Sequence, residues 1–302
     1  MGDEVKRGAM ITAAGNTTFQ PQQGRSAGPV AGRSPRRVPT LVRPLAHADL
    51  DRAAALFGDA RARMHARLRW YLHTPFAVIK GLYAGDALLG LGCGLQFGAS
   101  AYLAHLVVDS SLEGTDERAT LTATLLSEFA RNGACSVTMQ VDGTEVGVWE
   151  RQGFRPEQEF VRYQHGSCPH PAHEEVGLLQ PSQVLALFHL DERATGETRK
   201  QLLLEHRFAA HAYVEKGLVR GGLLPLLGQG LILAHHAEAG LELQRWLMPH
   251  QRGIIVPVRN AAACAHLEAA GHFAATAGVR MVLGRQLNFR PELVYAWPWD
   301  VA

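Results

Sequence analysis

The stretch that decides the fold is WERQGF at residues 149–154, which recurs in altered form as LEAAGHF at residues 267–273. Each copy follows a predicted strand and a short helix. Each also places an aromatic residue directly or shortly after its glycine, Gly153 or Gly271. Glycine is a typical helix stop because it enters the left-handed conformation at little cost. Since the elements around both stretches come in the same order, the sequence predicts a tandem duplication, with copies of about 125 residues that are close to the commonest domain size.

Hydrophobic periodicity predicts the elements of each copy. The first copy begins with a short strand at 41–44, a helix at 50–57 and a basic helix at 61–69. An antiparallel meander of strands at 77–83, 87–96 and 101–108 follows, then a helix at 118–132, a strand at 136–141, a helix at 145–152 and a strand at 158–163. In the second copy, helices are predicted at 181–190, 198–207, 238–248 and 261–270, with strands at 212–216, 218–225, 230–234, 253–258, 279–283 and 293–296. The predicted fold class is α+β, with each copy forming a mixed sheet flanked by helices.

Composition divides the 302-residue chain into four segments. Residues 1–38 are rich in Gly, Pro, Gln, Ser and Arg without periodicity, which predicts a flexible arm. The predicted first domain covers 39–165. A proline-containing linker covers 166–177, and the second domain covers 178–302.

Charge and apolar content exclude two classes of protein. Lys and Arg total 30 against 28 Asp and Glu, so the net charge of +2 lacks the basic excess of a nucleic-acid binder. No stretch reaches the ~18–20 apolar residues of a membrane span. The four cysteines have no C-x-x-C spacing, and the N-terminus has no secretory pattern, so we expect a reducing, cytoplasmic location.

Residues 106–118, LVVDSSLEGTDER, follow the meander and lead into a helix. Together with the repeated glycine-aromatic junction, they resemble the GNAT superfamily of N-acyltransferases. Four stretches of the second copy resemble the glycine-poor domain that ends many tandem GNAT proteins: residues 190–199, 233–240, 280–284 and 291–296. The resemblance implies two tandem GNAT-like acyl-CoA N-acyltransferase domains.

The resemblance also implies acetyl-CoA as co-substrate, held by the strand and loop of the first copy. In the family, backbone N–H groups of this loop and the following helix N-terminus bind the pyrophosphate. The expected cofactor residues are Leu106, Val107, Val108, Glu113, Gly114, Thr115, Asp116, Glu117 and Arg118. Glu113, Asp116 and Glu117 should weaken the binding of an anion, and Arg118 should restore part of it. The second copy has no glycine cradle, so we expect coenzyme A in the first.

The family's reaction is attack of an amine on the acetyl thioester, with a base for the amine and a donor for the leaving thiolate. Many members place a donor Tyr four residues before the junction glycine, where this chain has Trp149 and Leu267. His105 precedes the cofactor strand residues and is the candidate base. Its alternative is a packed histidine that shares a strand face with Leu103 and Val107.

Three other groups are weighed against simpler explanations. His165, Cys168, His170 and His173 match no ordinary zinc spacing, so a solvated linker is favoured and no metal is expected. His235 and His236 fit a helix start better than a ligand site. The arginines between 61 and 69 fit a solvated helix face, although such a helix would naturally border the acceptor cleft.

The sequence therefore predicts an N-acetyltransferase that moves an acetyl group from acetyl-CoA to an amine of a small molecule or protein. The alternative is a catalytically degenerate GNAT-fold protein that binds a ligand or stabilises an assembly. Neither a membrane nor nucleic acid is expected as a partner. A homodimer stays open.

Overall fold

A computed structural model describes residues 39–112, 116–172 and 174–299, with Val38–Ala302 forming one compact unit. The arm expected at 1–38 lies outside the described residues. Within them, no helix is long and apolar enough to cross a membrane.

Within the described residues, the first half contains six strands and four α-helices in an order that matches the sequence prediction. The strands are β1 (Thr40–Pro44), β2 (Ala77–Ala84), β3 (Ala87–Phe97), β4 (Ser100–Val108), β5 (Ser136–Val141) and β6 (Arg155–Gln164). The helices are α1 (Leu50–Ala55), α2 (Arg61–His73), α3 (Glu117–Arg131) and α4 (Val146–Glu150).

The second half repeats that order. Its strands are β7 (Val176–Leu178), β8 (His211–Glu215), β9 (Leu218–Leu224), β10 (Leu231–Ala234), β11 (Gly253–Pro257), β12 (Phe273–Gly284) and β13 (Val294–Ala296). Its helices are α5 (Val184–Thr195), α6 (Lys200–His206), α7 (Ala237–Leu247) and α8 (Ala261–Ala269). The sequence missed β7 and the first half of β12, while the other elements were predicted within a few residues.

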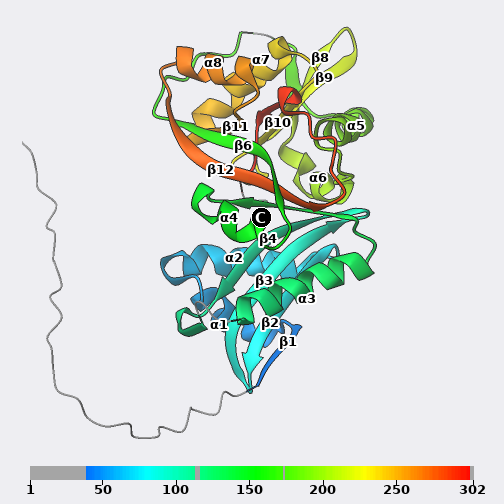
Figure 1. The fold of residues 1–302 in the computed structure, drawn as a ribbon. Helices are drawn as coiled ribbons and strands as arrows, with labels where there is room; N and C mark the ends of the chain where they lie inside the picture. The colour runs from blue at the N-terminus through cyan, green and yellow to red at the C-terminus, as the bar shows by residue number, and fades with distance from the viewer. Residues whose placement is uncertain (1–38, 113–115, 173, 300–302) are drawn as a thin grey trace, which may run out of the picture. The chain divides into compact units, whose positions relative to one another are not determined.

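The strands form two sheets, and the larger one contains strands of both halves. Its order is β1-β2-β3-β4-β5-β12-β6-β11, and only the pair β4–β5 is parallel. Strand β12 of the second half lies between β5 and β6 of the first, and β6 in turn pairs with β11 (Figure 1). The expectation that each half builds its own sheet is therefore wrong, because β6 and β12 are exchanged.

Gly278 permits this exchange. Its φ is +142°, and a Cβ there would lie 2.2 Å from the Val141 carbonyl oxygen and 2.5 Å from the Trp299 ring. Only glycine fits both the backbone conformation and the close approach. Residues of β12 before Gly278 therefore pair with β6 alone, and residues after it also pair with β5.

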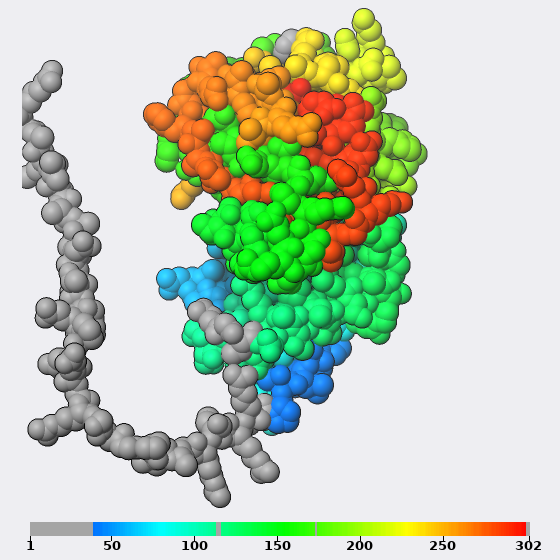
Figure 2. Space-filling view, viewed as in Figure 1, coloured from blue at the N-terminus to red at the C-terminus, as the bar shows by residue number. Residues whose placement is uncertain are grey.

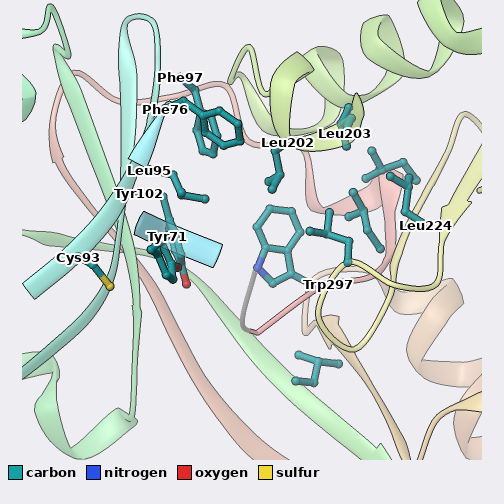
Figure 3. Packing of buried hydrophobic residues seen from close by; sticks show 14 of the residues in the cluster. Tyr71, Phe76, Cys93, Leu95, Phe97, Tyr102, Leu202, Leu203, Leu224 and Trp297 are labelled. Atoms are coloured by element: carbon teal, nitrogen blue, oxygen red, sulfur yellow. The ribbon is translucent and has the colours of Figure 1, made fainter. Parts of the chain in front are cut away.

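The second sheet has the order β13-β10-β9-β8-β7. One apolar cluster packs between the second sheet and the first half. Phe76, Leu95 and Phe97 of the first half belong to it together with Leu202 and Trp297 of the second (Figure 3). In the space-filling view, the green residues around α4 and β6 adjoin the red C-terminal segment (Figure 2).

A buried ion cluster also joins the two halves. Arg280 of β12 pairs with Glu157 of β6 and lies 3.4 Å from Glu197, which follows α5. Arg199 pairs with Asp191 at 2.5 Å. Exposure of these side chains is 6% or less. Because an unpaired charge is very costly at such burial, the cluster ties α5 to β6 and β12.

Candidate functional site

The candidate site lies where the parallel strands β4 and β5 separate. Their pairing runs from Ser100↔Ser136 to Leu103↔Met139. A pocket of about 200 Å³ opens beyond that point. Its lining residues come from α1–α2, β4, α3, β5 and α4: Phe57, Leu103, Ala104, His105, Leu106, Arg118, Met139, Gln140, Val141, Glu145 and Trp149.

A β-bulge at Ala104 shapes the pocket. Gly94 of β3 pairs with Leu103, but the next residue, Cys93, pairs with His105, so Ala104 is an extra residue of β4. A bulge reverses the alternation of side chains along a strand. Leu103 accordingly packs with the α3 face, whereas His105 contacts rings on the α1–α2 side. The expectation that His105 shares a face with Leu103 is therefore wrong.

His105 lies between two aromatic rings in an electropositive environment. The ring centroids of Phe57 and Tyr71 are 5.9 and 6.0 Å away, both edge-on. Burial, together with the smaller effect of the nearby charges of Arg67 and Arg63, lowers the pKa of His105 to about 4. The imidazole is therefore neutral at pH 7 and a weak base.

Arg118 crosses from the start of α3 toward α4. Its guanidinium lies 3.1 Å from the Glu145 carboxylate and 5.5 Å from the centroid of the Trp149 ring. Among the described residues, neither the Trp149 Nε1 nor the Arg118 Nε has a hydrogen-bond acceptor, although both atoms are buried. The side chains that line the pocket thus include two buried donors without a protein acceptor.

The structure brings together some of the residues predicted for cofactor binding. His105, Leu106 and Arg118 line the pocket. Val107 and Val108 continue β4 beyond it, paired with β3. The remaining positions are at the loop: Asp116 and Glu117 begin α3, and Glu113, Gly114 and Thr115 lie outside the described residues.

Sequence reasoning missed the wall of the pocket that faces β4. Met139, Gln140 and Val141 at the end of β5 and Glu145 before α4 supply it, and Phe57 closes one side. The parallel pairing of β4 and β5 was the available signal, because the ends of parallel neighbours meet at one edge of a sheet.

The corresponding gap in the second half is filled by the chain itself. Strand β13 pairs with β10 through Ile232↔Ala296 and Leu233↔Val294. On its other side, the Trp297 N–H donates to the Ile255 carbonyl of β11 at 2.8 Å. A strand therefore lies where the first half has its pocket.

Asn260 holds this plug in place. Its Oδ1 accepts from the Ala263 N–H at 3.0 Å and caps α8, while its Nδ2 donates to the Val294 carbonyl at 2.8 Å. In the first half, Asp142 caps the helical turn before α4 through Thr144 and contacts no such strand. Asn260 and Asp142 each lie eleven residues before the glycine of their junction, Gly271 or Gly153, and Asn260 has the further partner.

A side chain of β13 also covers the start of α7. His236 caps this helix as the sequence suggested, through its Nδ1 and the Ala239 N–H at 3.4 Å. The Tyr295 ring packs on Gly240, where an added Cβ would lie 2.4 Å from it.

No group of three potential metal ligands occurs among the described residues. His173, one member of the His- and Cys-containing stretch of the linker, lies outside them.

Comparison with solved structures identifies the fold. The chain is similar to a proposed acetyltransferase of Pyrococcus horikoshii, with a TM-score of 0.73 and 18% identity over 87% of this chain and 94% of that one. A GCN5-related N-acetyltransferase from Sphaerobacter thermophilus gives 0.57 and 16%, covering 84% and 99% of the two chains. A tandem GNAT protein from the clavulanic acid biosynthesis pathway gives 0.53 and 11%, covering 82% and 98%.

No protein-family model matches the sequence, and a comparison with curated proteins finds no match. The structural likeness extends over most of both chains in all three cases, so the fold is the tandem GNAT fold. The fold class and the resemblance expected from the sequence are confirmed.

Proposed function

We propose that this tandem GNAT-fold chain is an N-acetyltransferase with one coenzyme A site, located between β4 and β5 of the first half. One observation carries the proposal: the first gap between parallel strands holds a pocket, whereas β13 fills the second. A volume of about 200 Å³ is below the ~300–1,000 Å³ of pockets for drug-sized ligands. Only the thioester end would therefore lie inside.

The lining fits that end of the cofactor. Leu103, Leu106, Met139 and Val141 offer apolar walls for the pantetheine arm. The pyrophosphate would lie outside, beside Arg118 and the α3 N-terminus, where aligned peptide dipoles favour an anion. Asp116 and Glu117 oppose it there.

In the reaction, the amine nitrogen would attack the thioester carbonyl carbon, and the C–S bond would break after a proton leaves the nitrogen. His105 is our candidate acceptor of that proton. A ring with a pKa of about 4 is too weak a base for a free ammonium ion. It suits the tetrahedral intermediate, whose N–H proton is much more acidic. The thiolate would then take up one proton.

Three features favour the alternative, a protein that binds coenzyme A without turnover. They are the weak basicity of His105, the indole of Trp149 in place of a phenol, and the carboxylates at the start of α3. An indole N–H can donate a hydrogen bond to a thiolate, but it does not release its proton.

Acetyl-CoA binding and turnover separate these two functions. We expect acetyl-CoA to raise the melting temperature and to bind in calorimetry, because a ligand of the native state stabilises it by mass action. Ala104→Phe, which fills the pocket, should abolish both effects, while Ala123→Phe on the exposed face of α3 should change neither.

Release of free thiol with a panel of amines then reports turnover. Binding without thiol release would favour the alternative, and binding that survives Ala104→Phe would contradict the proposed site. The acceptor amine, the cytoplasmic location and a homodimer stay predictions.

A further inference from the structure

A second pocket, which we call the α7 pocket, lies in the second half and takes no part in the proposed reaction. It is lined by residues of β7, β8, β9, α7 and the turns that follow: Leu178, Ala209, His211, Leu223, Pro225, Leu226, Trp246, His250 and Gln251. Its volume is about 460 Å³, more than twice that of the first-half pocket. This size falls within the ~300–1,000 Å³ range of small-molecule sites.

The walls of the α7 pocket are largely apolar. Leu223 is buried at its base, whereas Leu178 and Leu226 are exposed by 60% and 51%. Leucines this exposed around a concave surface are typical of a binding site, because a ligand would remove them from water.

One end of the pocket is polar and has an unused donor. The Trp246 Nε1 is buried, and no acceptor reaches it among the described residues. A buried donor left without a partner is costly, and an indole nitrogen can only donate. The His211 ring lies 5.4 Å from the Trp246 ring, tilted by 41°.

The polar side chains around this end favour a ligand that accepts hydrogen bonds. Two imidazoles, His211 and His250, line the pocket, and no acidic side chain does so within the described chain. Burial lowers the pKa of His211, although a hydrogen bond with the Ala209 backbone acts against it. The His211 ring is therefore neutral at pH 7 and keeps one N–H that can donate to a carboxylate.

From this geometry we propose that the α7 pocket binds a small carboxylic acid with an apolar body, its carboxylate accepting from the Trp246 N–H beside His211 and His250. The aliphatic or aromatic body would cover Leu223 and Leu226. This site is independent of the coenzyme A site, because none of its lining residues belongs to the first half.

Octanoate is a suitable probe, with octanol as its uncharged counterpart. The chain has five tryptophans, so a protein labelled with ¹⁵N gives at most five indole signals, and Trp246→Phe identifies its own by loss. Octanoate should shift the Trp246 indole proton downfield and leave that of Trp149, in the first-half pocket, in place. Octanol should bind about tenfold more weakly.

Variants test the two ends of the pocket separately. Trp246→Phe keeps the ring and removes the donor, so the Kd for octanoate should rise about tenfold. Leu226→Glu places a like charge at the rim and should weaken octanoate by a similar factor. Leu41→Glu on β1, where the leucine is 63% exposed, is the matched control and should have no effect.

Three results would overturn the proposal. They are an octanoate-induced shift at Trp149 instead of Trp246, equal affinity for octanol and octanoate, and unchanged affinity in Trp246→Phe. Each is independent of acetyl-CoA binding, so the two sites are tested apart.

Discussion

The gap between β4 and β5 and the gap between β10 and β11 occupy corresponding places in the two halves, yet one is open and the other closed. The first keeps a pocket beside His105 and Arg118. The second contains β13, which a hydrogen bond from Asn260 holds in place. The ring of Tyr295, a residue of β13, packs on Gly240 near the start of α7. Two halves with the same order of elements can therefore differ at one site, because the chain's own backbone fills the second gap.

The largest expected effect concerns the ion cluster that joins the halves. Arg280→Leu would leave Glu157 and Glu197 buried without their shared cation, which should lower the free energy of unfolding by about 3–5 kcal/mol. Urea denaturation measures it. Arg131→Leu is the control, because this surface arginine is 69% exposed and pairs with Glu128, so less than about 1 kcal/mol is expected. Equal midpoints for both variants would mean that the cluster does not couple the halves.

His105 should make the first half sensitive to acid. Between pH 6.5 and about 4, an unfolded chain protonates this ring while the folded chain does not, so stability falls as the pH falls through that window. The loss amounts to about 3 kcal/mol by pH 4. His105→Gln should lack this part of the loss in urea denaturation at stepped pH, whereas His65→Gln should keep it.

The same substitution tests catalysis. His105→Gln should lower turnover more than acetyl-CoA affinity, as expected for a base that acts in the transition state. If acceptor turnover in the wild type falls with a midpoint near pH 6.5, the group responsible is not His105.

Gly240→Ala tests the plug in the second gap. The new methyl group would meet the Tyr295 ring at 2.4 Å, so we expect a destabilisation of roughly 1–3 kcal/mol by overpacking, despite alanine's better helix propensity. Thermal unfolding measures it, with Thr120→Ala at the exposed fourth position of α3 as the control. Adding Tyr295→Leu should recover stability. A stabilised Gly240→Ala protein would show that β13 leaves the α7 terminus free.

The smallest expected effects are at the cofactor loop. Asp116→Gly should tighten acetyl-CoA by about two- to fivefold, because it removes a like charge from the helix N-terminus, and Arg118→Ala should weaken it by a similar factor. Glu238→Gly, in the first turn of α7, should have no effect in calorimetry. A response to Glu238→Gly but not to the α3 variants would reverse the assignment of the halves.

The sequence predicted the order of elements because that order depends on local periodicity and on glycine stops such as Gly153 and Gly271. It could not predict which sheet β12 joins, since the alternation of its side chains suits either neighbour. The bulge at Ala104 was also hidden, because one inserted residue leaves no mark on an apolar strand. Leu106 and Arg118, expected at one site, both line the first-half pocket, while the strand face expected for His105 was wrong.

The exchange of β6 and β12 also bears on how the chain is made. Strand β5 leaves the ribosome with one edge unpaired, and its neighbour β12 follows more than a hundred residues later. At about 5–20 residues per second, that edge stays open for roughly 7–26 s. An apolar edge such as Val137–Val141 can meanwhile pair with other nascent chains. The yield of native protein should therefore depend on synthesis rate and on chaperones that cover β5 until the second half arrives.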